Sequence, residues 1–113
     1  MRKDNRIIKK SKFKTTKGVE YKVLFRKPDA RWFDDADGYC QDPNSENPKI
    51  LVNPYLTDQS ELNTIIHEIG HAFFWDKTEK EIAQFANTCS RILYERGFAH
   101  NTKRNPQRKK RNK

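Results

Sequence analysis

Residues 19–26 alternate between apolar and polar side chains, a period of two that is typical of a half-buried β-strand. The apolar side holds Val19, Tyr21, Val23 and Phe25, and the other holds Glu20, Lys22 and Arg26 together with one extra apolar residue, Leu24. Residues 15–18 indicate a turn before this strand, so residues 6–14 are expected to supply a hairpin partner. Residues 49–53 predict a third short strand, closed by a proline. Between them, residues 29–48 are rich in Asp, Asn, Pro and Gly and are expected to form a long surface loop.

A helical pattern begins after the third strand. Apolar residues recur every three or four positions across residues 58–75, and Asp58 with Glu61 three positions later predicts the helix start. The apolar stripe consists of Leu62, Ile65, Ile66, Ile69 and Phe73. Gly70 lies in mid-helix, where glycine costs about 1 kcal/mol relative to alanine, and close approach of a neighbouring helix is the expected reason. Asp76-Lys77 breaks the pattern.

A second helix is predicted directly afterwards. Thr78 and Glu81 form a capping-box pattern at its start, and Gly97 is expected to stop it. Its inward stripe consists of Ile82, Ala86, Cys89 and Leu93, with Phe85 and Ile92 beside it. The order of elements predicts an α+β fold, in which a small three-stranded sheet packs on a helical hairpin.

Length and charge define the expected organisation. The 113 residues allow one domain, expected at 18–101, with a basic N-terminal segment at 1–17 that holds the candidate first strand and a basic disordered tail at 102–113. Residues 1–17 and 103–113 each have a net charge of +7, whereas residues 18–102 have a net charge of −5. Such ends are usually solvated, but they also suit a partner with a phosphate backbone, so nucleic acid is a candidate partner.

No apolar run approaches the about 20 residues of a membrane span, and the N-terminus lacks a signal-peptide core. We therefore expect a cytoplasmic protein without membrane partners. The two cysteines, Cys40 and Cys89, are expected to be free thiols there.

The first helix carries the candidate chemistry, His67-Glu68-Ile69-Gly70-His71. Histidines four positions apart leave the same face of a helix, so His67 and His71 can bind one ion. Zinc accepts such nitrogen ligands, and a catalytic zinc site takes three protein ligands and a water. Glu68, beside the first histidine, is placed to act as general base toward that water. The motif predicts a zinc-dependent hydrolase.

A third ligand is required, and the candidates are Glu79, Glu81, Asp76 and His100. Position 79 continues the inward series of the second helix and is therefore the preferred ligand. Glu81 already has a role in the capping box, and Asp76 is the expected loop residue or partner of a histidine. His100 lies in a polar segment and is expected to face solvent.

The motif from His67 to His71, followed by Glu79-x-Glu81-Ile82-Ala83-Gln84-Phe85-Ala86, resembles the gluzincin zinc metallopeptidases. The size resembles the minimal gluzincins, and residues 36–97 resemble small SprT-like metallopeptidases encoded by phages. The resemblance implies His67, His71 and Glu79 as zinc ligands, Glu68 as the base, and a peptide or protein as the substrate. It also implies that residues 50–52 are an edge strand able to hold an extended peptide.

If the protein is phage-encoded, the resemblance places it in the cytoplasm of the host cell. An oxyanion-stabilising residue is not indicated among Tyr39, Tyr55, Tyr94 and His100. The alternative function is a nucleic-acid-associated protein, with a structural or weakly active zinc site and basic ends that supply the binding.

Overall fold

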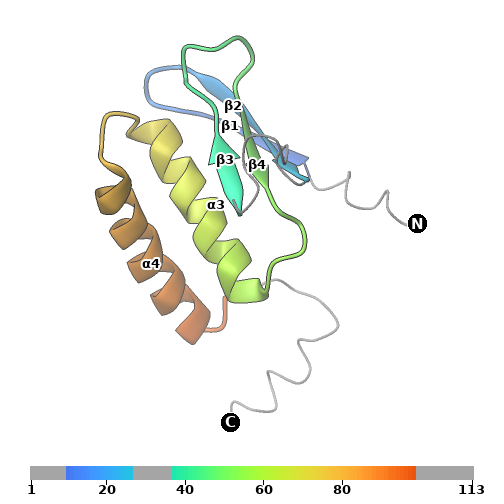
Figure 1. Cartoon of the computed structure of the whole chain (residues 1–113), viewed down its shortest axis with the longest axis vertical. Helices are drawn as coiled ribbons and strands as arrows, with labels where there is room; N and C mark the ends of the chain where they lie inside the picture. Colours follow the sequence, from blue (N-terminus) through green and yellow to red (C-terminus); the bar gives the residue numbers. More distant parts are fainter. Residues whose placement is uncertain (1–9, 27–36, 99–113) are drawn as a thin grey trace, which may run out of the picture.

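The computed structural model describes residues 10–26 and 37–98, which form a four-stranded sheet and two helices (Figure 1). The strands are β1 (Lys10–Lys14), β2 (Glu20–Phe25), β3 (Gly38–Cys40) and β4 (Lys49–Val52), and the helices are α3 (Asp58–Phe73) and α4 (Glu79–Glu95). The α+β class is as predicted, but the prediction of three strands is wrong because the sheet has four. The additional strand, β3, lies in the stretch that was expected to be a loop.

The first hairpin follows the predicted pattern. The Gly18 N–H donates to the Thr15 carbonyl at 2.9 Å, and Gly18 has a φ of 86°, which glycine adopts without steric cost. The turn brings β1 antiparallel to β2, with Ser11 opposite Val23. Tyr21 and Val23 are buried, whereas Glu20 and Lys22 are exposed, so the alternation correctly identified the inner face. The part of the expected partner strand before Lys10 lies outside the described residues.

The strand order is β1-β2-β4-β3. β4 pairs parallel with β2 and antiparallel with β3, so β4 is internal and the expectation that residues 50–52 form an edge strand is wrong. Its sequence explains the position, because Ile50, Leu51 and Val52 are all buried and a strand buried on both faces has a continuous apolar run. β3 takes the edge instead.

The helices stack outward from the sheet. α3 packs against β3 and β4, and α4 packs on α3, on the side away from the sheet (Figure 1). The core between α3 and the sheet includes stacked rings. The ring centroid of Phe13 lies 5.6 Å from the ring centroids of both Tyr21 and Phe73. Within the described parts of the chain, neither helix has the length and apolar character of a membrane span.

The ends of α4 agree with the prediction made from the local sequence, whereas the start of α3 differs from it by one residue. Thr78 and Glu81 form both hydrogen bonds of the capping box of α4, as predicted. At its other end the Phe98 N–H donates to the Leu93 carbonyl at 2.9 Å, and Gly97 has a φ of 92°, as in a glycine-terminated helix. α3 differs from the prediction: Thr57 is its cap and accepts from the Ser60 N–H, so Asp58 lies in the first turn.

Both cysteines are free thiols, as predicted, but their surroundings differ. Cys40 is buried in the core, and burial is the main cause that raises the pKa of its thiol from 9.0 to about 12. Because the thiolate is the reactive form, the raised pKa lowers its population at pH 8 by about 10³-fold, and burial also restricts access. Iodoacetamide at pH 8 should therefore modify half-buried Cys89 first, as measured by peptide mass spectrometry.

In a Cys89→Ser variant the native protein should resist alkylation at pH 8 and react promptly in denaturing urea. Modification of Cys40 in the native protein at the rate of Cys89 would contradict the burial and protonation argued for Cys40.

Candidate metal centre

His67 and His71 lie one helical turn apart on α3 and direct their imidazoles to the same point. Their Nε2 atoms are 3.1 Å apart, and their rings meet edge to face at a centroid distance of 4.8 Å. The i, i+4 spacing places both side chains on the same face of the helix. Both histidines are largely buried, with side-chain exposures of 17% and 16%. At this separation, a single ion beside the two rings would be within reach of both nitrogen atoms.

Glu79, the first residue of α4, completes this group from across the helical hairpin. Its Oε1 lies 2.9 Å from Nε2 of His71, and its Oε2 lies 3.1 Å from Nε2 of His67. A short turn makes the approach possible: the Lys77 N–H donates to the Phe74 carbonyl at 3.0 Å, and Thr78 then caps α4. Residues 74–78 are thus sufficient to return the chain to the histidine face.

The packing of α4 on α3 sets the distance between the two sides of this group. A Cβ on Gly70 would lie 3.3 Å from the Cγ2 of Ile82, tighter than an ordinary van der Waals contact. Gly70 therefore lets Ile82 of α4 approach the backbone of α3, as the sequence predicted. Ile82 is itself buried, so this contact holds the start of α4, and with it Glu79, near the histidines.

The arrangement of the three side chains fits a metal ion. The ligand atoms of His67, His71 and Glu79 all lie within 4.8 Å of one another. In a tetrahedral zinc site with bonds of about 2.0–2.1 Å, neighbouring ligand atoms lie about 3.3 Å apart. The separations here of 2.9–3.1 Å come within a few tenths of an ångström of that value. Two nitrogen lone pairs and a carboxylate directed at one point are the donor set that a divalent cation satisfies.

Glu68 lies next to this group but points toward the sheet. It is buried, with 8% of its surface exposed, and an added Cβ on Gly38 of β3 would lie 3.1 Å from its Cγ. Burial is the main cause, and the charge of Glu79 the second, that raises the pKa of the Glu68 carboxyl from 4.5 to about 7. The side chain therefore occupies the space between the His67–His71 face of α3 and the edge strand β3.

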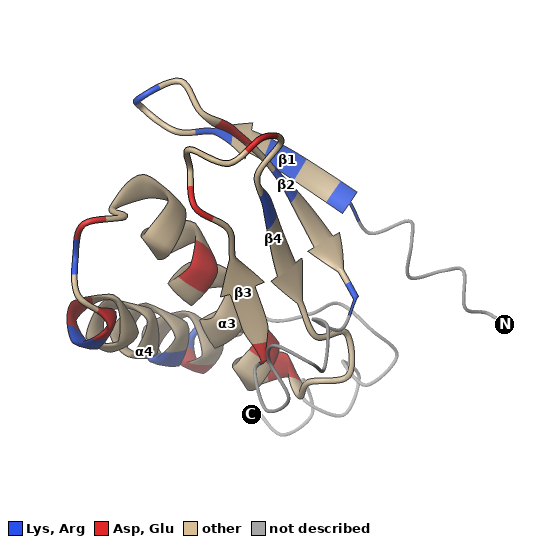
Figure 2. Ribbon diagram, turned by 45° about the horizontal axis from the view of Figure 1, so that its top comes forward, with Lys and Arg blue, Asp and Glu red and all other residues tan. Residues whose placement is uncertain are grey.

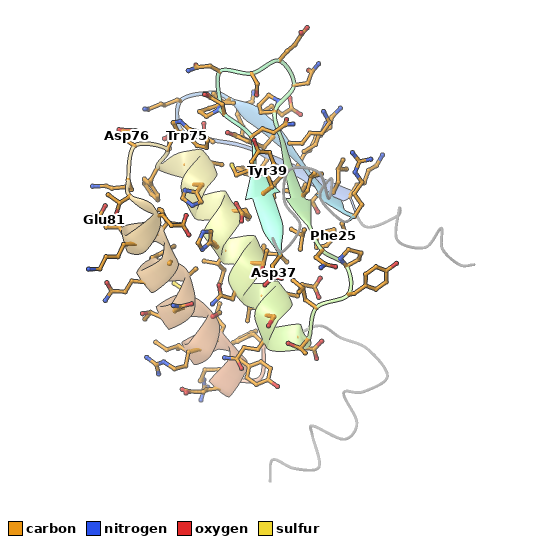
Figure 3. The ribbon with its side chains drawn as sticks, in the orientation of Figure 1. Phe25, Asp37, Tyr39, Trp75, Asp76 and Glu81 are labelled. Atoms are coloured by element: carbon orange, nitrogen blue, oxygen red, sulfur yellow. The ribbon has the colours of Figure 1, made fainter. Side chains whose placement is uncertain are left out.

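The other sequence candidates for the third ligand are placed elsewhere. Glu81 accepts from the Thr78 N–H at 3.2 Å, so its carboxylate is engaged in the capping box. Asp76 is exposed at the turn between the helices, beside Trp75, and Glu81 lies on the first turn of α4 (Figure 3). His100 lies outside the described residues. The structure thus brings Glu79, and neither Glu81 nor Asp76, into the group with the histidines.

The tyrosines considered as oxyanion-stabilising residues lie away from the group. Tyr39 alternates with Gly38 and Cys40, which face α3 and the core, so its side chain leaves the opposite face of the sheet. Tyr55 is 78% exposed and precedes α3, whose first residue lies about 14 Å along the helix axis from His67. Tyr94 is fifteen residues beyond Glu79, about 22 Å along α4.

Gly38 is a positioning residue that the sequence analysis missed. An added Cβ there would lie 2.5 Å from the Cγ2 of Thr64 and 3.1 Å from Glu68, so only glycine lets β3 lie this close to α3. Its signal was an Asp-Gly pair in a polar stretch, which equally predicts a turn. Trp75 was also missed; its ring makes an edge contact with His71 at 6.5 Å and stays 43% exposed at the rim of the group.

Comparison with known proteins gives a family. The family model of the IrrE N-terminal-like domain, Peptidase_M78, matches residues 20–96. This range includes β2, both helices and the three residues of the candidate metal-binding group, His67, His71 and Glu79. No curated protein and no solved structure matches the chain. The matched segment covers well over half of the sequence and coincides with the part of the fold that holds His67, His71 and Glu79. The chain therefore belongs to the IrrE N-terminal-like domain family, a zinc metallopeptidase-like family.

Proposed function

We propose that this protein is a zinc-dependent metallopeptidase of the gluzincin type. In this proposal His67, His71 and Glu79 hold the zinc ion, and Glu68 is the general base. One observation carries it: two histidine nitrogens from α3 and one carboxylate from α4 converge within 4.8 Å, beside a buried glutamate that follows the first histidine. The membership in a peptidase family supports the same reaction class.

Each residue has a distinct part in the proposed reaction. The chemistry that zinc supplies when bound is Lewis acidity, which polarises a peptide carbonyl and makes water a stronger nucleophile. Glu68 accepts the proton of the attacking water at its carboxylate and passes it to the leaving amine. Its burial against β3 restricts the carboxylate to the border of the metal-binding group and limits exchange with bulk water. His71 and Glu79 also fix the hairpin geometry, since their contact joins α3 to α4.

The substrate backbone is proposed to lie along β3. β3 is one of the two edge strands of the described sheet, and Gly38 brings it against Glu68. An extended peptide added to this edge would form main-chain hydrogen bonds and pass beside the proposed base. This moves the predicted peptide-binding strand from residues 50–52 to β3, for the reason that β4 has partners on both sides.

The proposal is tested by metal content and by hydrolysis together. Protein purified without chelator should contain about one zinc per chain by elemental analysis, and a His67→Ala variant should lose most of it because two donors remain. A peptide library should be cleaved by the zinc-loaded protein. Chelation should stop cleavage, and added zinc should restore it.

A matched control is Gln84→Ala, which changes an exposed residue of α4 two positions from the buried Ile82 and so on the outer side of the helix. It should retain zinc and cleavage. Full zinc content in a His67→Ala/His71→Ala double variant would contradict the proposed site, and hydrolysis that is insensitive to chelator would contradict the proposed reaction.

A further inference from the structure

Lysines line up across the sheet on the face opposite α3. The register places Lys12 of β1 directly opposite Lys22 of β2, and Lys22 directly opposite Lys49 of β4. Lys10 and Lys14 lie two positions to either side of Lys12 and so share its face. The three strands therefore present five lysines on one surface, called here the lysine face: Lys10, Lys12, Lys14, Lys22 and Lys49.

The alternation of the strands proves which face this is. Tyr21, Val23 and Ile50 are buried in the core beneath α3, and the lysines occupy the alternate positions. The exposed lysines are Lys10, Lys12, Lys14 and Lys22, and 70% of the Lys12 side-chain surface is accessible to solvent. Figure 2 shows blue segments on β1, β2 and β4, whereas most red segments lie on the helices and connecting loops, where further blue segments also lie.

The arrangement is unfavourable for the isolated fold. Like charges directly opposite each other in neighbouring strands destabilise a sheet, and the two pairs Lys12–Lys22 and Lys22–Lys49 are both of this kind. Within β1, β2 and β4 the acidic residue is Glu20, which pairs with Lys12 at 3.5 Å. Most of this positive charge is therefore left for solvent or for an external anion.

The spacing suits a repeating anion. Neighbouring strands lie about 4.8 Å apart, and alternate residues of β1 lie about 7 Å apart, so the five lysines form a two-dimensional array of cations. On β2 and β4 this array is bordered by half-buried Leu24 and buried Leu51. Lysine ammonium groups bind phosphates as point charges, and the cations within β1, β2 and β4 are all lysines, with Arg26 directly after β2. Duplex DNA carries one phosphate charge per about 1.7 Å of its axis, divided between two strands. Its phosphates therefore form two rows, which match a two-dimensional array of lysines better than a single row would.

The position of the aromatic residues favours a duplex over a single strand. Proteins that bind single strands stack bases on exposed aromatic rings. The aromatic residues of β1, β2 and β4 are Phe13, Tyr21 and Phe25, and all three pack on the inner side of the sheet. Tyr39 of β3 shares the face opposite α3 but is half-buried, so the three lysine-bearing strands offer charge without a stacking platform.

We propose that the lysine face binds the phosphate backbone of duplex DNA without sequence preference. This site is separate from the metal-binding group, because α3 and the sheet lie between them (Figure 1). DNA bound there leaves His67, His71 and Glu79 accessible, so binding is expected to be independent of zinc. The proposal does not rest on the basic ends of the chain.

The test compares two triple variants of the full-length protein on a fluorescein-labelled 20-base-pair duplex. Lys12→Gln/Lys22→Gln/Lys49→Gln should weaken binding and lower the slope of log K against log salt by about 2 to 3, since each phosphate contact contributes about 0.9. Fluorescence anisotropy between 50 and 200 mM NaCl measures both quantities. Circular dichroism should show the same fold, because the substituted side chains point outward.

The matched control removes the same charge from the helical side, with Lys77→Gln/Lys80→Gln/Arg96→Gln. This variant should keep the wild-type slope, and chelation should leave both slopes unchanged. Equal losses of affinity in the two triple variants would overturn the proposal, because binding would then depend on the total charge of the protein. An unchanged salt slope in the sheet variant would also overturn it, because the basic ends of the chain would then account for the binding. Tighter binding to the matching single strand, to duplex RNA, or to polyglutamate at equal charge would also overturn it.

Discussion

A Glu68→Gln variant is expected to retain one zinc per chain and to lose about 10²–10⁴-fold in the rate of peptide hydrolysis, the typical contribution of a general base. The amide has the shape of the carboxylate but accepts no proton at the reaction pH. The fold should be retained, because a neutral amide is less costly than a carboxylate at a position with 8% exposure. Elemental analysis and cleavage rates on any substrate of the parent protein measure the two outcomes.

Asp76→Asn is the matched control, since it also removes one acidic charge near the metal-binding group but at the exposed turn between the helices. It should leave the rate within a few-fold of the parent. Wild-type hydrolysis by Glu68→Gln would refute the assignment of the base. The same variant separates the two functions considered from the sequence, because a nucleic-acid-associated protein with a structural zinc site would keep its biological effect without this carboxylate.

The second large effect is expected from a pair of glutamates on the first turn of α4. Glu79→Gln should weaken zinc binding and abolish hydrolysis. The loss of zinc affinity should exceed the about 10–100-fold that follows when a residue hydrogen-bonded to a ligand, rather than a ligand itself, is removed. Its carboxylate lies 2.9 Å from His71 and 3.1 Å from His67, and an amide oxygen is a weaker zinc ligand. The stability of the metal-free protein should change little, since the Glu79 side chain is 71% exposed.

Glu81→Ala should show the opposite pattern. Loss of its contact to the Thr78 N–H removes one half of the capping box and should lower the free energy of unfolding by about 1 kcal/mol. Zinc content and hydrolysis should be kept. Competition with a chromophoric chelator and urea denaturation measure affinity and stability in both variants, and zinc lost on changing Glu81 alone would contradict the helix rotation in which Glu79 faces α3.

Local chemistry determined much of this protein from the sequence alone. The alternation in β2 identified the inner face because successive strand residues point to opposite sides. The capping box and Gly97 marked the ends of α4 because those hydrogen bonds join residues only a few positions apart. The pairing of His67 with His71 follows from the helical repeat in the same way.

The preference for Glu79 over Glu81 was also available before the structure, because periodicity places position 79 with Ile82 and Ala86 on one helical face. The separation of the two helices was not available. It depends on the contact of Gly70 with Ile82, which joins residues twelve positions apart. The sequence predicted the close approach of a neighbouring helix at Gly70, but neither the residue that makes it nor its distance.

Only the tertiary structure decided the order of the sheet and the surroundings of Glu68. β3 has three residues in a stretch rich in turn formers, so its own sequence predicts a loop, and it exists as a strand because β4 offers an edge and Gly38 fits against Thr64. Placing β3 there makes β4 internal and buries Glu68, which raises its pKa. These features depend on contacts between segments that are distant in the sequence. The free energy of those contacts comes from burial in a common core, so it cannot be predicted from the pattern of residues within one segment.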